Sequence, residues 1–381
     1  MGIVQTISEA DVAQGTSGPL VVDALRASQI AGDTALMDDW DRLARAAATP
    51  NPFFESWYLL PALTHIRGAR DVVVLTVRHY GRLIGLLPVQ PQLRYDRFLL
   101  PHWRIWVHEN CFCGLPLVAR GLEDLFWRGA LDWCDANAGQ RLFLHLSQIP
   151  LDTPVIAALR RTALSNRRVS VVREEQRALL HSTLSPQAYF EAAMTQKKRK
   201  ELRRQKRRLE ESGTLAFQRD SDDRGLDDWI AQFLALEAAG WKGKGDSALA
   251  SQEDTQALFR AALSGAAERG LLERLTLTLD QRPVAMLANF ITAPGAYSYK
   301  TTYDEDLARF SPGVLLQIEN LDLLARGDIE WCDSCATPDH PMIDRIWKER
   351  LAVGRISVGI GGSLRRAAFR QIVAREKSRP L

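Results

Sequence analysis

The sequence has no long hydrophobic run, few cysteines and little net charge. No stretch of its 381 residues approaches the roughly twenty apolar residues of a membrane-spanning helix. The first residues include acidic side chains and lack the apolar core of a secretion signal. Five scattered cysteines fit a reducing compartment better than a disulfide framework. A formal net charge of +3 is too small to indicate a nucleic-acid or membrane partner by itself. We therefore expect a cytoplasmic protein.

The cysteines also fail to form a recognisable metal motif. Cys111 and Cys113 lie close to His108, but their spacing matches no common zinc pattern, so we expect buried core residues there. Cys332 and Cys335 form a single CxxC, which is weak evidence for metal or redox use without a partner pair. We predict no metal site.

The length exceeds what one hydrophobic core usually organises, so we expect two domains. We predict an N-terminal lead-in (1–33), a first domain (34–180), a second domain (181–370) and a tail (371–381). In the first domain, apolar periodicity and turn signals predict helices alternating with strands, which is typical of an α/β layer domain with a mixed sheet. The expected helices are 34–47, 122–138 and 153–164; the expected strands are 72–78, 83–90, 141–146 and 169–173.

The second domain repeats this order, and we interpret the similarity as a weak internal duplication. A strand is expected at 215–219, and helices at 229–239 and 255–269. The strands predicted at 272–279 and 284–291 form a hairpin that mirrors the hairpin of the first domain. A last buried strand is expected at 329–332.

The most biased composition lies at the start of the second domain. Lys197 to Arg208 is almost wholly basic. Ser185 and Pro186 would begin one helix, Gly213 would end it, and an apolar stripe would anchor it through Tyr189, Met194, Leu202 and Leu209. Because charges of one sign repel, we predict contact with a polyanion or a phosphate-bearing ligand. The alternative is a solvated helix face with no partner.

The segment 297–324 is predicted to be a strand, a tight turn and a helix in succession. Tyr297, Tyr299, Thr301 and Tyr303 alternate with other residues and would lie on one face of the strand. The turn is Arg309-Phe310-Ser311-Pro312-Gly313. The free N–H groups of the helix that follows would form an anion site. The alternative is a corner that only supports the fold.

The chain from about Trp40 onward resembles the acetyltransferase-like family of the GNAT superfamily that is often associated with cellulose biosynthesis. The double-GNAT layout of this family is shared with the Fem peptidyltransferases. The motifs that carry the resemblance are, in order, Phe54-Glu55-Ser56-Trp57, Gly81-Arg82-Leu83-Ile84-Gly85-Leu86-Leu87-Pro88, Gly114-Leu115-Pro116-Leu117, the basic segment, Gly240-Trp241-Lys242-Gly243, Gln281-Arg282-Pro283-Val284-Ala285, Tyr303-Asp304 and Ser311-Pro312-Gly313.

The resemblance implies an α/β fold of two tandem GNAT-like domains, each with a mixed, mostly antiparallel sheet flanked by helices. It implies that Tyr297 to Tyr303 is a splayed strand that pairs with an acyl-carrier arm. The co-substrate would be acetyl-CoA or another acyl-CoA, bound by Arg309, Ser311, Gly313, Val314 and Lys300. This turn has fewer glycines than most GNAT enzymes, and Pro312 removes one amide donor.

Acyl transfer to an amine needs a base for the ammonium proton and an acid for the leaving thiolate. His340 is the predicted base, Asp333 or Asp304 would orient the amine, and Tyr299 or Tyr303 would protonate the sulfur. The acceptor would contact Trp241, Lys242, Trp347 and Lys348. Cys335 as a nucleophile, close to Asp339 and His340, is an alternative.

The main functional prediction is an N-acyltransferase that acts on an amine of a small molecule or sugar, in surface polysaccharide biosynthesis. A second prediction, from the Fem likeness, is an aminoacyl-tRNA donor with the basic helix on the RNA backbone, although the long Fem helical arm is absent. A third is an inactive double-GNAT protein that binds a polyanion. The sequence does not determine the acyl group or the oligomeric state.

Overall fold

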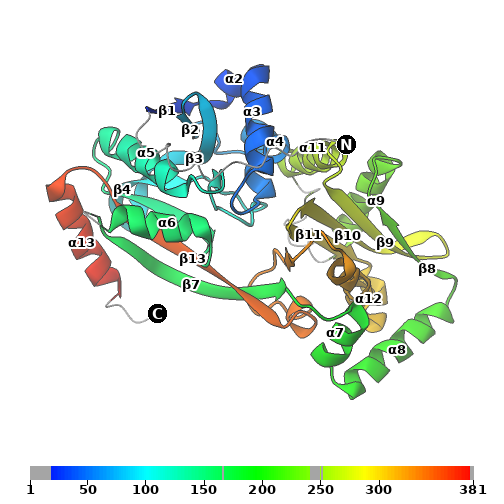
Figure 1. Cartoon of the computed structure of the whole chain (residues 1–381). Coiled ribbons are helices and arrows are strands. Elements are labelled where there is room, and N and C mark those ends of the chain that lie inside the picture. Colours follow the sequence, from blue (N-terminus) through cyan, green and yellow to red (C-terminus); the bar gives the residue numbers. More distant parts are fainter. Residues whose placement is uncertain (1–18, 165–166, 241–248, 250–251, 378–381) are drawn as a thin grey trace. The chain divides into compact units, whose positions relative to one another are not determined.

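The computed structural model describes residues 19–164, 167–240, 249 and 252–377. The chain forms two compact units (Figure 1). Unit 1 consists of Met1–Ser56, Gly68–Glu174 and Gly354–Leu381, and unit 2 of Trp57–Arg67 and Glu175–Val353. Both units are discontinuous in sequence, whereas the predicted domains were continuous, and the predicted boundary near residue 180 stays a prediction.

Unit 1 contains a mixed sheet in the order β1-β2-β3-β4-β6-β13-β7, with β5 paired to β3. The pairs from β1 to β4 are antiparallel, and β4 with β6 is parallel. The second half of β13 and the first half of β7 belong to this unit. The strands are β1 (Leu20–Leu25), β2 (Val73–His79), β3 (Arg82–Tyr95), β4 (Phe98–Ile105), β5 (Leu117–Val118), β6 (Phe143–Pro150), β7 (Val169–Leu180) and β13 (Glu349–Gly359).

Helices flank this sheet. In α5, Trp133 packs on Trp103 of β4 at 5.2 Å between ring centroids, so α5 covers the face to which Trp103 points. At the C-terminal end, Phe369 of α13 packs on Phe143 of β6 at 5.5 Å. The helices of unit 1 are α2 (Ala27–Ile30), α3 (Thr34–Arg45), the 3-10 turn η1 (Pro52–Phe54), α5 (Glu123–Ala136), α6 (Pro154–Ala163) and α13 (Ser363–Lys377).

In unit 2 the strands follow the order β7-β12-β11-β10-β9-β8. Among these described strands, β11 pairs with β12 in parallel, and the other pairs are antiparallel. The predicted hairpin and the strand after it are confirmed as three neighbouring strands. The strands that lie wholly in this unit are β8 (Leu215–Asp220), β9 (Leu272–Leu279), β10 (Arg282–Thr292), β11 (Gly295–Tyr303) and β12 (Trp331–Asp333).

Helices α9 and α11 lie on one face of the β9-β10-β11 sheet, and α12 lies on the other (Figure 1). Trp229 of α9 donates to Thr276 of β9 at 2.8 Å, whereas Gln317 of α12 donates to Thr301 of β11 at 3.1 Å. The helical elements are α4 (Ser56–His65), α7 (Pro186–Ala193), α8 (Gln196–Glu210), α9 (Leu226–Ala239), α11 (Glu253–Glu268), η3 (Glu305–Phe310), α12 (Pro312–Glu319), η4 (Asn320–Ala325) and η5 (Ile343–Arg345).

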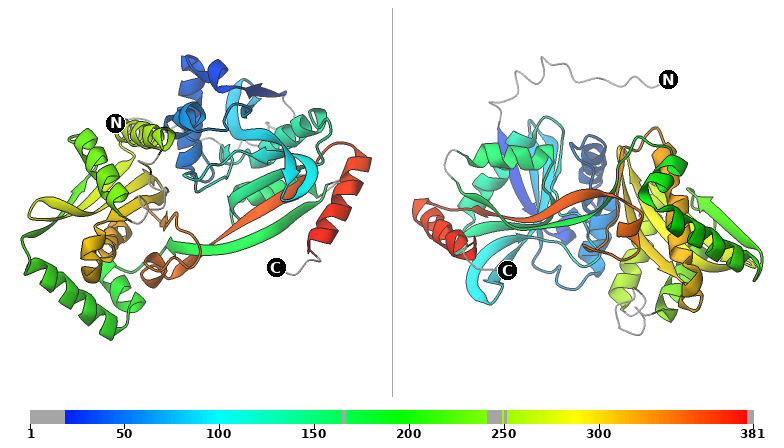
Figure 2. Two further views of the ribbon diagram at one scale, coloured as in Figure 1. Left: turned by 180° about the vertical axis from the view of Figure 1, so that it is seen from behind. Right: turned by 90° about the horizontal axis from the view of Figure 1, so that it is seen from below.

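Both units use the same order of elements, in agreement with the predicted duplication. Three antiparallel strands are followed by a helix and then by a strand that pairs in parallel with the third (Figure 2). These are β2-β3-β4, α5 and β6 in unit 1, and β9-β10-β11, α12 and β12 in unit 2. Each unit is thus a mixed, mostly antiparallel sheet flanked by helices, as predicted.

The basic segment differs from the prediction of one continuous helix. Met194 has an extended backbone and ends α7, and the Thr195 side chain then caps α8 by accepting from the Lys198 amide at 3.3 Å. The apolar stripe is nevertheless buried as predicted, with Leu202 2% and Leu209 0% exposed. Of the helices in the described ranges, none has the length and hydropathy needed to cross a membrane.

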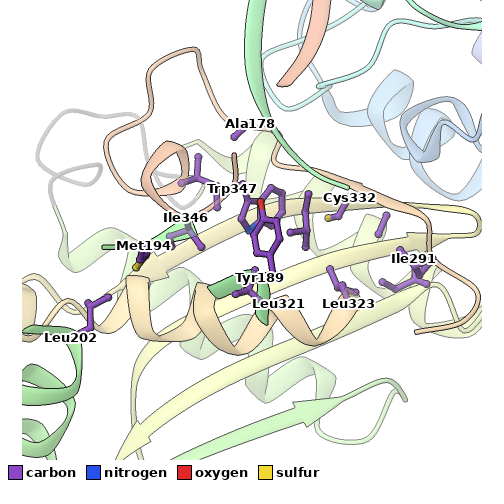
Figure 3. Packing of buried hydrophobic residues seen from close by; sticks show 14 residues of the cluster. Ala178, Tyr189, Met194, Leu202, Ile291, Leu321, Leu323, Cys332, Ile346 and Trp347 are labelled. Atoms are coloured by element: carbon purple, nitrogen blue, oxygen red, sulfur yellow. The ribbon is translucent and has the colours of Figure 1, made fainter. Parts of the chain in front are cut away.

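A large apolar cluster of unit 2 surrounds Tyr189 and Trp347 (Figure 3). Leu202 of α8, Leu321 of η4 and Cys332 of β12 belong to it. A second cluster joins Leu209 of α8 to residues of η3 and α12. Helix α8 is therefore held by both clusters through its two leucines, which leaves its basic side chains at the surface.

Candidate functional site

The parallel pairing between β11 and β12 is short. It covers only Gly295–Tyr297 of β11, opposite Trp331–Asp333 of β12. From Ser298 to Tyr303, β10 is the only described strand that pairs with β11. The parallel ladder therefore ends at Tyr297, where its partner β12 also ends at Asp333, and a splayed strand stays a prediction.

A β-bulge changes the faces of β11. Ala288 pairs with Lys300 and Asn289 with Ser298, so Tyr299 is the extra residue. A bulge reverses the alternation beyond it. Tyr299 therefore stacks on Phe290 at 4.5 Å, on the face of α9 and α11. The predicted placement of Tyr297, Tyr299, Thr301 and Tyr303 on one face is wrong, because Thr301 and Tyr303 lie on the face of α12.

The connection from β11 to α12 is longer than the predicted tight turn. The 3-10 helix η3 occupies Glu305–Phe310, and the guanidinium of Arg309 lies over the Phe310 ring at 4.8 Å. Ser311 has a left-handed backbone (φ 55°) and gives no side-chain cap to α12. Pro312 has no N–H, and the Leu315 amide donates within the helix to the Ser311 carbonyl. In the first turn of α12, the amides that can donate to a ligand are therefore those of Gly313 and Val314.

Gly313 is needed for close packing at this helix start. A Cβ placed on it would lie 3.0 Å from Cδ1 of Tyr303 and 3.2 Å from Sδ of Met342. The structure thus brings the Tyr303 ring and the loop after β12 to the first turn of α12. Gly313 is also one of the residues predicted to bind acyl-CoA, and that role stays a prediction.

His340 lies in the same loop as Met342. Its Nδ1 accepts from the amides of Met342 and Ile343 at 3.4 and 3.5 Å. These contacts favour the tautomer of the neutral ring that carries its proton on Nε2. The role of His340 as a base stays a prediction.

Gln317 connects α12 to β11 and was not identified from the sequence. Its Nε2 lies 3.5 Å from Oγ of Ser298 and 3.1 Å from Oγ1 of Thr301, one on each side of the bulge. Gln317 is 2% exposed, and its Oε1 accepts from Asn320 at 3.3 Å. A glutamine inside an otherwise apolar helical run was the available signal, because buried amides require partners.

Both predicted aspartates are held by arginines. Asp304 caps η3 by accepting from the Asp306 amide and forms an ion pair with Arg282 at 2.8 Å. Asp333 is 0% exposed, forms a buried ion pair with Arg177 and accepts from the Cys335 amide at 3.0 Å. These contacts give both carboxylates structural partners, and their role in orienting an amine stays a prediction.

The other predicted site residues are dispersed over unit 2. Tyr299 is 2% exposed, its hydroxyl lies 3.2 Å from that of Tyr58, and Nζ of Lys300 lies 5.7 Å from its ring centroid. Trp347 is 0% exposed within the apolar cluster, so its predicted contact with a substrate is not met in this structure. Lys348 is exposed, and Trp241 and Lys242 lie outside the described residues.

Helix α8 presents a basic surface. Lys198, Lys206 and Arg207 each lie within ion-pair distance of a glutamate. Within the described residues, a second group of cations forms no ion pair, and its members are exposed on the side opposite the buried leucines. We name this group the basic face: Lys197, Lys200, Arg203, Arg204 and Arg208.

All five cysteines are free and buried. Burial and the neighbouring Asp333 raise the pKa of Cys332 well above its usual range, and burial raises that of Cys134 to about 12. A raised pKa leaves little thiolate. We expect a thiol reagent such as DTNB at pH 8 to modify no cysteine of the native protein and all five after unfolding. Rapid reaction of Cys335 in the native protein would instead favour its predicted nucleophilic role.

The part of the chain that the structure describes contains no group of three or more histidine, cysteine or acidic side chains placed to hold a metal ion. Cys111 and Cys113 are buried, as predicted, with 4% and 0% exposure.

Comparisons with known proteins agree with this geometry. Residues 196–341 match the acetyltransferase (GNAT) domain family. The fold is similar to the crystal structure of FemX, with 10% identity, a TM-score of 0.55, and coverage of 88% of this chain and 98% of that one. It is also similar to a conserved protein of unknown function from Bacteroides thetaiotaomicron, with 10% identity, a TM-score of 0.53 and coverage of 85% and 97%.

A third similar structure is the C-terminal domain of a putative lysylphosphatidylglycerol synthetase from Agrobacterium fabrum. The identity is 12%, the TM-score is 0.51, and the coverage is 90% of this chain and 96% of that one. No curated protein sequence matches this chain. At these identities the structural similarities establish the fold alone.

Proposed function

We propose that this chain, whose residues 196–341 match the acetyltransferase (GNAT) domain family, is an acyltransferase that transfers an acyl group from acyl-CoA to an amine. The observation that supports the proposal is the end of the β11–β12 ladder at Tyr297, while β11 itself continues to Tyr303 and leads to a start of α12 without a side-chain cap. The backbone of β11 beyond Tyr297 would pair with the pantetheine arm, and the helix start would bind the pyrophosphate.

The pyrophosphate would accept hydrogen bonds from the amides of Gly313 and Val314, beside the Ser311 hydroxyl. Because Pro312 supplies no amide, the exposed guanidinium of Arg309 would provide the charged contact. Lys300 lies on β11 beside Tyr299 rather than at the start of α12. We therefore propose that it contacts the acyl-CoA along β11 and not at the pyrophosphate.

In the transfer, the neutral amine nitrogen attacks the thioester carbonyl and gives up one proton, the C–S bond breaks, and the leaving thiolate takes a proton, so that an amide and the free thiol of CoA are formed. Tyr303 is the better placed of the two predicted acids, because its ring lies against Gly313 whereas Tyr299 points to the opposite face. The Nε2–H of His340 would donate to the developing oxyanion. We further propose that the acceptor is an amino-sugar precursor of a surface polysaccharide. This identity of the acceptor rests on the family resemblance alone.

A release assay tests this function. The protein is mixed with acetyl-CoA or a longer acyl-CoA and a panel of amines that includes glucosamine, and free thiol is measured. We expect CoA release that depends on the amine and yields an acylated product by mass spectrometry. Release that is unchanged by every amine, or no release at all, would contradict the proposal for these acceptors.

The basic face of α8 supports a second candidate, in which aminoacyl-tRNA is the donor. The cations of the basic face, which form no ion pair with the described residues, suit a phosphate backbone, and their contacts would weaken steeply with salt. Aminoacyl transfer from charged tRNA, with no release from any acyl-CoA, would favour this candidate. Binding of RNA without any transfer would instead indicate the predicted inactive binding protein.

A further inference from the structure

The sheet of unit 1 has a polar face that the proposed acyl transfer does not use. On β3 and β4, Gln92 pairs with His102 and Gln90 with Arg104; on β6, His145 pairs with Arg104. Paired residues lie on the same face of a sheet. Trp103, between His102 and Arg104, packs on Trp133 of α5, so the polar residues point away from α5.

The neighbouring strand β13 extends this face. Oγ of Ser357 lies 2.9 Å from Nδ1 of His145, and Arg355 precedes Ser357 by two residues, which places Arg355 on the same side of the strand. On β6, Ser147 follows His145 by two residues. Its hydroxyl is buried and has no hydrogen-bond partner among the described residues.

The two arginines of this face lack a counter-charge. Arg104 is half-buried, and burial together with the charge of Arg355 lowers its pKa. Within the described ranges, neither arginine forms an ion pair or a side-chain hydrogen bond. Arg167, a more deeply buried arginine of unit 1, differs in this respect, because its guanidinium lies 2.7 Å from the Asp135 carboxylate. Two guanidiniums that repel each other without a carboxylate are suited to bind an anion.

The two histidines add polar atoms without adding charge. Nδ1 of His102 donates to the Leu100 carbonyl oxygen at 2.8 Å, and the His102 ring stacks on that of Phe143 at 4.7 Å between centroids. Burial is the largest cause that lowers the pKa of His145 to about 3, and electrostatic repulsion from His102, Arg104 and Arg355 adds to it. The imidazole of His145 is therefore neutral at physiological pH, and the positive charge resides on the two arginines.

We propose that this face of unit 1 binds a small polar molecule through an anionic group, a carboxylate or a phosphate, that pairs with Arg104 and Arg355. The planar guanidinium matches both oxyanions in a bidentate manner. The amide side chains of Gln90 and Gln92, on the adjoining strand, would contact hydroxyl groups of the same molecule. The site lies wholly in unit 1 and is independent of the donor site proposed in unit 2.

Calorimetric titration at low ionic strength tests the site. The probes are inorganic phosphate, glucose 6-phosphate, gluconate and, as the uncharged control, glucose. We expect saturable binding of at least one anion, no binding of glucose, and affinity at least tenfold weaker in Arg104→Gln and Arg355→Gln. The exposed Arg97→Gln of the same unit is the matched control and should bind as the native chain does.

Phosphate binding without gluconate binding assigns the phosphate class, and the reverse assigns the carboxylate class. The proposal is overturned if none of the anions shows saturable binding. It is also overturned if the double variant, Arg104→Gln with Arg355→Gln, binds an anion as tightly as the native chain does. Histidine-selective NMR of the native chain provides an independent readout if the variants do not fold. The bound anion should shift the His102 and His145 signals but not those of the exposed His65 and His181. Shifts confined to His65 and His181 would also overturn it.

Discussion

Arg177→Met lowers the free energy of unfolding by about 3–5 kcal/mol, because it leaves the Asp333 carboxylate buried without a counter-charge. The two side chains are 5% and 1% exposed. Removal of one partner of such a pair costs more than the pair contributes, since the remaining charge keeps its desolvation penalty. Urea denaturation followed by tryptophan fluorescence measures the loss.

Two further variants identify the cause. In Arg177→Met with Asp333→Asn, the charge is removed but the side chain still accepts from the Cys335 amide, so we expect recovery of at least about 2 kcal/mol. Arg161→Met breaks an exposed pair, 57% and 56% accessible, and should cost less than about 1 kcal/mol. A loss in Arg177→Met no larger than in Arg161→Met would contradict the account of this ion pair.

Arg309→Ala raises the dissociation constant for acetyl-CoA by about 10- to 100-fold. The estimate comes from a charged hydrogen bond of about 1.5–3 kcal/mol, at about 1.4 kcal/mol per factor of ten. Because Pro312 at the first helical position has no amide donor, we expect Arg309 to carry a larger share of the pyrophosphate binding than it would beside another donor. Competition against a fluorescent CoA analogue measures the change.

Arg260→Ala is the control for this experiment, because Arg260 is an exposed arginine of α11 in the same unit. It should leave the dissociation constant unchanged. The melting temperature of Arg309→Ala should also match that of the native chain, since its side chain is exposed and lies on the Phe310 ring. Equal affinity of the two variants would remove Arg309 from the donor site.

Apolar periodicity predicted most helices of both units, because each buries one stripe against its sheet. Helices α3, α5, α9 and α11 lie within a few residues of the predicted ranges. Composition alone did not reveal the break between α7 and α8. The break depends on the extended backbone of Met194 and the cap from Thr195, and both residues also fit a continuous helical pattern.

The site was predicted less completely, since single backbone irregularities decide which side chains meet. The extra residue Tyr299 reverses the alternation along β11 and separates two tyrosines that the sequence pattern places together. The partner of Asp333 is Arg177, 156 positions away in sequence, and no local pattern links them. The aromatic Trp347 was predicted to bind a substrate, but it fills a core that also includes Tyr189 and Cys332.

Discontinuous units were also beyond the reach of local patterns. Trp57 and Tyr58 belong to unit 2 because they pack on Phe290 of β10, at 4.9 and 6.0 Å between ring centroids. Nothing in the apolar sequence around Trp57 distinguishes this destination from the core of the first unit. The positions of such segments are set by tertiary contacts between residues that are distant in sequence.

Calorimetric titration of the native chain with acetyl-CoA, and with longer acyl-CoAs, tests the donor site at α12 most directly. The account predicts saturable binding at one site per chain, displaced by 3′,5′-adenosine diphosphate, which carries phosphates without the acyl arm. A chain that melts cooperatively but binds none of the acyl-CoAs would contradict the assignment of acyl-CoA as donor.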